Sequence, residues 1–211
     1  ENKNYYIFHS LYGRRVNDVL SRSIGYGLKR LQFRDMEIGV NDNGFYLAST
    51  EKLKIMNAIE RIHSNELEKV MENAIERTEV LSRRFRHCAT RGLMILREYK
   101  GKRKRVGRQQ VSSMLLLSAV KRIDNDFSIL KEARREVLED LMDIENAKKV
   151  IKGIEDKKIA IKEIITNIPS PFAFNIVLEA RTDVFKIEDK IEFLRRMHQM
   201  VLAKIGQKEI I

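Results

Sequence analysis

The sequence predicts an α+β fold that is mostly helical, with a small antiparallel sheet. Apolar residues recur at helical spacing over most of the 211 residues, and two short apolar runs flank an Asn-Gly pair near the N-terminus. With 43% hydrophobic residues, the chain can bury a substantial core. We expect three or four strands packed on a helical array that contains one long helix.

The N-terminal part of the chain supplies most of the predicted sheet. Tyr5–Leu11 is rich in β-branched and aromatic residues, which favours a strand. Apolar residues then follow helical spacing, which predicts a helix over Arg14–Leu31. The strands Met36–Val40 and Phe45–Ala48 are joined by Asn41-Asp42-Asn43-Gly44, and an Asn-Gly pair tolerates the positive φ angles of a tight hairpin.

Helices dominate the middle of the chain. A short helix is predicted over Lys52–Ile62, and a long one steps by threes and fours from Leu67 to about Tyr99, a reach of roughly 45–50 Å. The nearly all-apolar Val111–Ile123 predicts a buried helix. Ile129–Asn146 predicts a strongly amphipathic helix, and Ala147–Ile154 continues as a shorter one.

The C-terminal part combines one predicted strand with a final helix. Lys158–Thr166 begins with alternating apolar residues and is expected to return to the sheet as a strand. Pro169-Ser170-Pro171 interrupts regular structure, and Ile187–Ile205 predicts an amphipathic helix. We expect one accessory domain over residues 1–211, divisible into an α/β subregion (1–62 with 158–180) and a helical subregion (63–157).

Nearly all of the net charge of +11 comes from one stretch. Between Arg83 and Arg108 the chain has eleven basic residues and one acid, Glu98, while the remainder has 30 basic and 29 acidic residues. A concentrated field of one sign indicates a polyanionic partner. Arg dominates the helical half of the stretch, and its planar guanidinium suits phosphate geometry.

This basic window supplies the candidate binding residues. Seven-residue spacing places Arg84 and Arg91 within about 20° on a helix, whereas Arg83 and Arg86 diverge by about 60°. Gln109 and Gln110 are candidate donors to sugars or base edges. A second candidate patch, for which a solvated helix face is an equal alternative, consists of Arg14, Arg15 and Arg22. The candidate phosphate contacts are Arg83, Arg84, Arg86, Arg91, Lys100, Lys102, Arg103, Lys104, Arg105 and Arg108.

Other kinds of site have little support in the sequence. Gly101-Lys102 lacks the surrounding residues of a phosphate-binding loop, so we expect no ATP hydrolysis by this chain alone. The four histidines are scattered, which argues against a zinc site. Cys88 lies on an apolar stripe and is expected to be a small buried hydrophobe. Acids near Glu139-Asp140 lie beside Arg134 and Arg135 and predict an ion-pair face. We expect neither a catalytic residue nor a metal site.

The expected environment is cytoplasmic. The sequence begins with polar residues and has no run of about eighteen apolar residues, so we expect neither a secretory leader nor a membrane span. One cysteine allows no internal disulfide, which suits a reducing compartment.

Several blocks of the sequence are distinctive in their order: YGRRVNDVLSRSIGYGL, VNDNGF, RRFRHCATRGLMIL, GRQQ, FSILKEARREVLEDLMDIENA and NIPSPFAFNIVL. Together they resemble the C-terminal part of the helicase core in large helicase-related (Lhr) proteins, particularly the archaeal ones. The resemblance covers nearly all of the chain. This region is the domain associated with DEAD/DEAH-box helicases. Bacterial members often carry a Trp before the matching glutamines, where this chain has Gly107-Arg108.

The resemblance implies a part of a larger machine. In that family, two RecA-like motor domains bind ATP and Mg²⁺, a winged helix follows, and this domain completes a channel for single-stranded DNA. The enzyme moves 3′ to 5′ and unwinds duplexes that include RNA:DNA hybrids. The implied partners of this chain are therefore single-stranded nucleic acid and the motor and winged-helix domains of the same polypeptide.

Three interpretations from different classes follow. The first is a nucleic-acid-binding accessory domain, which predicts salt-sensitive binding of single strands without sequence preference. The second is an interaction or autoinhibitory module whose basic patch docks on an acidic protein surface. The third is a hydrolase or nuclease, which requires an acid or histidine cluster that the sequence does not provide. We favour the first.

Overall fold

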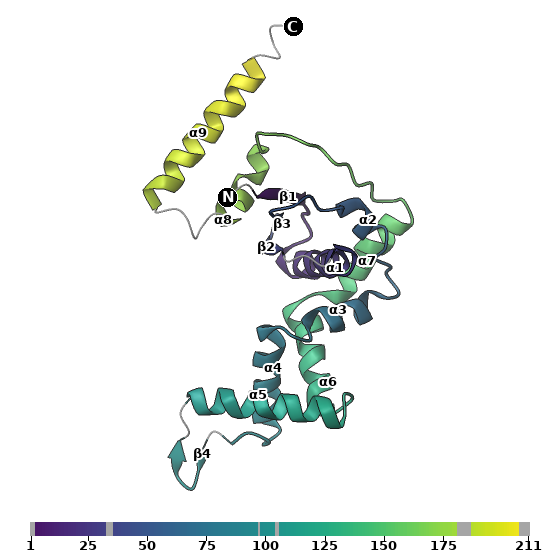
Figure 1. Cartoon of the computed structure of the whole chain (residues 1–211), viewed down its shortest axis with the longest axis vertical. Coiled ribbons are helices and arrows are strands. Elements are labelled where there is room, and N and C mark those ends of the chain that lie inside the picture. Colours follow the sequence, from purple (N-terminus) through teal and green to yellow (C-terminus); the bar gives the residue numbers. More distant parts are fainter. Residues whose placement is uncertain (1–2, 33–35, 97, 104–105, 181–186, 207–211) are drawn as a thin grey trace.

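The computed structural model describes residues 3–32, 36–96, 98–103, 106–180 and 187–206. Figure 1 shows a small sheet surrounded by helices in the upper part of the view and a helical arm below it. A two-stranded hairpin lies at the far end of the arm, and the last helix lies beside the sheet region. The predicted mostly helical α+β class is confirmed.

The sheet has three antiparallel strands in the order β1-β3-β2. Phe45 on the central strand lies opposite Phe8 and Val40, and the Phe8 and Phe45 rings stack 4.3 Å apart. A Cβ atom at Gly44 would lie 2.0 Å from the Phe8 carbonyl oxygen, so only glycine fits this turn. The predicted N-terminal strand and hairpin are confirmed. The strands are β1 (Asn4–His9), β2 (Glu37–Asn41) and β3 (Gly44–Ser49).

Helix α1 (Arg14–Gln32) packs on β2 and β3 and agrees with the predicted helix. A Cβ at Gly25 would lie 2.8 Å from Ile38 Cδ1, so the end of the Ile38 side chain would have to move if this residue were larger. Three more helices contact α1 around the same core. They are α2 (Ile55–Ile59), α3 (Leu67–Ile75) and α7 (Ile144–Glu155).

The C-terminal elements follow an extended segment. A single 3₁₀ turn, η2 (Pro171–Ala173), leads into α8 (Phe174–Ala180), which contacts β2 and β3 and buries Ile176. Helix α9 (Ile187–Gly206) confirms the predicted final helix, with Phe193 and Met197 on its buried side.

Three helices build the arm. Helix α4 (Glu79–Arg91) packs on α5 (Val106–Ile123) and on α6 (Ser128–Arg135), and α6 continues into a π-helical turn, η1 (Glu136–Leu141). Most of the buried apolar residues form one contiguous cluster that runs from the sheet into the arm. The hairpin at the tip consists of β4 (Glu98–Tyr99) and β5 (Lys102–Arg103).

The predicted long helix from Leu67 to Tyr99 is wrong. Thr78 ends the first segment and starts the second: its hydroxyl donates to the Ile75 carbonyl, and its Oγ1 accepts from the Leu81 amide at 3.4 Å. Gly92 caps the end of α4, and Leu93 then adopts a φ of +59°. The chain therefore turns twice where apolar spacing alone favoured a continuous rod.

Three other helical predictions also need correction. The predicted helix Ile129–Asn146 is interrupted, because η1 ends at an extended Met142 and Asp143 then caps α7 by accepting from the Asn146 amide. The helix predicted as buried over Val111–Ile123 instead exposes one apolar side. Fully buried packing fails there because α5 lies at the edge of the arm (Figure 1). The short helix predicted over Lys52–Ile62 is limited to α2.

Lys158–Thr166 is not a fourth strand. The segment is described throughout, pairs with no strand, and exposes Ile164 and Ile165 to solvent. Figure 1 shows it crossing from α7 to α8. Its alternating sequence satisfied the pattern of a strand, but the segment pairs with neither edge strand of the sheet, β1 or β2.

Candidate nucleic-acid interface

Helix α4 carries the first half of the basic window. Helix α4 packs against α5 and α6, and its apolar stripe, which consists of Leu81, Phe85, Cys88 and Ala89, is buried. On its other side, arginines of α4 that were predicted as phosphate contacts line a cleft of about 520 Å³. The cleft is lined by Glu79, Val80, Arg83, Arg84, His87, Arg91 and Leu141. The structure therefore brings three of the predicted arginines together.

A buried carboxylate holds two of these arginines. The Glu136 side chain is 4% exposed; Arg91 donates to its Oε1, and Arg84 donates to Oε2 at 3.3 Å. Burial by itself would raise the pKa of Glu136, but the hydrogen bond from Arg91 and the charges of Arg91 and Arg84 outweigh burial and lower the pKa. Glu136 thus remains ionised and neutralises part of the positive charge of α4.

The π-helical turn puts this carboxylate in place. Glu136 begins η1, and a single turn of this kind often marks a functional or strained position. The sequence analysis missed Glu136, although its spacing of three residues from the buried Ala133 places it toward the core side of α6. An acid at a core-facing position was the available signal, because buried carboxylates require partners.

Other contacts on α4 are weaker or internal. Arg83 pairs with Glu79 at 3.2 Å, and both side chains are largely exposed. No acid of the described residues lies within ion-pair distance of the half-buried Arg86. Cys88 is buried, as predicted; burial raises the pKa of its thiol, and Arg91 donates to its Sγ at 3.3 Å.

The second half of the window forms the hairpin. Glu98 lies opposite Arg103, and Tyr99 lies opposite Lys102. The turn residues Lys100 and Gly101 have φ angles of +50° and +68°, the conformation of a tight hairpin turn with two left-handed residues. The Lys100 and Lys102 side chains are exposed at the tip of the arm.

Helix α5 follows the hairpin directly. Gln109 is half-buried and Gln110 is exposed, both in the first turns of the helix. Among the described residues, no acid pairs with Lys102. The predicted Lys104 and Arg105 lie outside the described residues, as do the side chains of Arg103 and Arg108.

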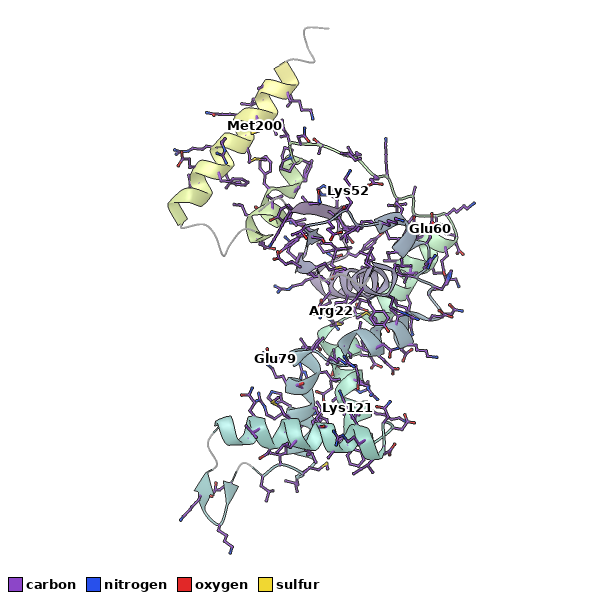
Figure 2. All side chains as sticks on the ribbon, in the orientation of Figure 1. Arg22, Lys52, Glu60, Glu79, Lys121 and Met200 are labelled. Atoms are coloured by element: carbon purple, nitrogen blue, oxygen red, sulfur yellow. The ribbon has the colours of Figure 1, made fainter. Side chains whose placement is uncertain are left out.

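The second candidate patch is largely engaged in the fold. Arg15 donates to the carbonyl oxygens of Glu139 and Met142, at 2.5 and 2.9 Å, and so caps the end of η1. Arg22 pairs with Asp18 at 2.7 Å on the surface of α1, where Figure 2 labels it. The Arg14 side chain is exposed. The structure does not join these residues to the cleft on α4.

The acids that the sequence assigned to an ion-pair face do form one. Arg135 contacts Glu139 at 3.2 Å and Asp140 at 3.5 Å, and Lys148 contacts Glu145 at 3.0 Å. Within the described ranges, no group of three His, Cys, Asp or Glu side chains could hold a metal ion.

The described helices were also compared with the length and apolar character of a membrane-spanning helix. None of them is long and apolar enough to cross a bilayer.

A family model described as DEAD/H associated matches residues 1–173. The chain belongs to the DEAD/H-associated family. Among its relatives, the ATP-dependent helicase Lhr-Core of Methanothermobacter thermautotrophicus is 52% identical over 96% of the chain, and that of Saccharolobus solfataricus is 41% identical over 97%. This family assignment agrees with the resemblance found in the sequence.

A solved structure of the same kind supports the fold. The Mycobacterium smegmatis helicase Lhr, in a structure bound to single-stranded DNA and AMP-PNP, matches 82% of the chain with a TM-score of 0.72 and 28% identity. The match spans 22% of that chain, and the present chain spans 24% of the length of the two archaeal relatives. This DEAD/H-associated chain therefore corresponds to about a quarter of its relatives.

Proposed function

We propose that this chain is the nucleic-acid-binding accessory domain of an ATP-dependent helicase, and that it grips single strands mainly through the hairpin and the start of α5. Membership of the DEAD/H-associated family and the archaeal Lhr-Core relatives support the helicase assignment. The single-stranded DNA in the related M. smegmatis structure supports the class of ligand.

One observation carries the choice of surface. Three of the four arginines of α4 contact acids of the fold, since Arg84 and Arg91 hold Glu136 and Arg83 pairs with Glu79; the fourth, Arg86, is half-buried. Lys102 is exposed on the hairpin, and no acid of the described residues contacts it; the hairpin lies at the far end of the arm (Figure 1). Cations that are not neutralised within the fold can release counterions from a phosphate backbone, which is the main source of sequence-independent affinity.

In this proposal the accessory domain holds the strand while other domains move it. ATP and Mg²⁺ belong to the two RecA-like motor domains that the Lhr resemblance implies, and a winged helix lies between motors and accessory domain. Translocation from 3′ to 5′ and unwinding of RNA:DNA hybrids are properties proposed for the whole helicase. Lysine and arginine side chains of this chain would supply contacts to successive phosphates, and Gln110 would donate to a sugar or base edge.

The test is a fluorescence-anisotropy titration of a labelled 20-nucleotide single strand across a salt series. One variant changes Lys102, Arg103, Lys104 and Arg105 to Ala. For each lost phosphate contact, the slope of log affinity against log salt should become shallower by about 0.7, and so by about 2 to 3 in total.

A control with equal charge loss separates contact from net charge. It changes four exposed lysines of α7 and the segment that follows it to Ala: Lys149, Lys152, Lys158 and Lys162. We expect its slope to match that of the unaltered chain. Equal slopes for the two variants would remove the hairpin from the interface. A folded chain that binds no strand at low salt would contradict the proposed binding and favour docking on an acidic protein surface.

A further inference from the structure

Helix α5 has an exposed apolar side next to the basic hairpin. Val111, Met114 and Leu115 are 57%, 59% and 68% exposed. The opposite side of the helix packs into the arm through Ser113, Leu117 and Val120. At 100° per residue, the three exposed residues lie on the other side of the helix from this buried stripe. The result is a small apolar face near the start of α5.

The size of this face suits a short stretch of nucleic acid. Val111 and Leu115 are separated by four residues, or about 6 Å along the helix axis. Stacked nucleotides of one strand are about 3.4 Å apart, so the face has room for about two bases. Nucleobases present flat apolar faces, and aliphatic side chains such as Leu and Met pack against them in other complexes. The chain has no Trp that could serve instead.

Charge complementarity selects the occupant. From Tyr99 to Ile123 the sequence has eight Lys and Arg residues and no acid. Among the described residues, Lys100, Lys102 and Arg103 lie in the hairpin and Arg108 in the first turn of α5, on one side of the apolar face, and Lys121 and Arg122 lie on the other. Glu76 holds Lys121, while Arg122 is exposed. An apolar strip between two cationic ends fits a polymer of apolar bases on an anionic backbone.

We propose that Val111, Met114 and Leu115 form a platform on which unstacked bases of a single strand pack, while the hairpin cations hold the phosphates. This inference rests on the proposed function and extends it from backbone contacts to base contacts. It assigns the exposed side of α5 to bases, regardless of their sequence, because every base has an apolar face.

The test compares two labelled strands of equal length, 20-mer oligothymidine and a strand of the same backbone without bases. The variant changes Met114 and Leu115 to Ser in the full 211-residue chain. We expect the unaltered chain to prefer oligothymidine, and the variant to bind oligothymidine about tenfold more weakly, the size of one lost base contact. Its affinity for the baseless strand and its salt slope should not change.

A matched control changes Ile164 and Ile165 to Ser, two exposed apolar residues on the segment between α7 and α8. This control should leave both affinities unaltered, and equal thermal midpoints for all three proteins would show intact folding. Salt-sensitive binding without preference for oligothymidine would overturn the platform and leave the proposed function standing. Loss of affinity for both strands, or for neither, would assign the face to a polypeptide partner. Failure of the unaltered chain to bind either strand would overturn both proposals.

Discussion

The two halves of the basic window differ in what the fold does with their charge. On α4, Arg84 and Arg91 converge on the buried Glu136, and Arg83 has an acid one turn away. On the hairpin, Lys102 is exposed and has no acid partner among the described residues. Two stretches that are equally rich in Lys and Arg therefore differ in role: the charges of one pair with acids of the fold, and the charge of Lys102 in the other is exposed to a ligand.

The buried acid beside α4 explains the difference. Arg84 and Arg91 lie where the helix packs against α6 and η1, so the carboxylate of Glu136 can reach them. The hairpin extends beyond the packed helices of the arm (Figure 1). Figure 2 shows Glu79 at the other end of α4, close to the body of the molecule. Position along the arm thus decides which cations the fold neutralises.

The largest expected effect is on stability, and it tests the half of the basic window that lies on α4. Glu136→Gln keeps the shape of the side chain but removes the charge shared by two guanidiniums. We expect the free energy of unfolding to fall by about 1.5–3 kcal/mol, the usual contribution of hydrogen bonds to charged groups. Urea denaturation measures the loss. The control, Glu132→Gln, affects an exposed pair with Arg135 and should leave the midpoint unchanged; equal losses would deny Glu136 a special role.

The same carboxylate predicts a dependence on pH. The folded pKa of Glu136 lies below its ordinary value of 4.5, so its stabilising contribution is present above that pH and is lost as the pH falls through the folded pKa. The stability difference between the unaltered chain and Glu136→Gln should be full near neutrality and shrink below about pH 4. Urea midpoints from pH 7 to pH 3 measure it. A difference that stays constant with pH would mean that ionisation of Glu136 contributes nothing.

The smallest expected effect compares one cation from each half. Lys102→Gln should make the salt slope of single-strand binding shallower by about 0.7 and leave the unfolding midpoint unchanged. Arg84→Gln should lower the unfolding midpoint, because Glu136 loses one of its partners, and change the slope by less than half as much. Anisotropy titration and urea denaturation on both variants measure the pair. A larger change of the salt slope in Arg84→Gln than in Lys102→Gln would indicate that the strand binds at the cleft on α4 instead of the hairpin.

Much of the fold could be predicted from local patterns. The first strand, the Asn-Gly hairpin, α1 and α9 follow from residue type and spacing, which act over a few residues. The helix breaks at Thr78 and Met142 could not be found in this way, because apolar spacing continues across both. The exposed segment 158–166 shows the same limit, since a strand requires a neighbour that sequence alternation does not guarantee.

The sequence by itself determined the class of the fold, the family and the concentration of charge between Arg83 and Arg108. Tertiary structure alone decided which of those charges are neutralised. Glu136 is 52 residues from Arg84 and 45 residues from Arg91, so no local pattern connects them. Tertiary structure also decided that one side of α5 stays exposed, because burial depends on which elements pack beside a helix as well as on the apolar residues of the helix itself.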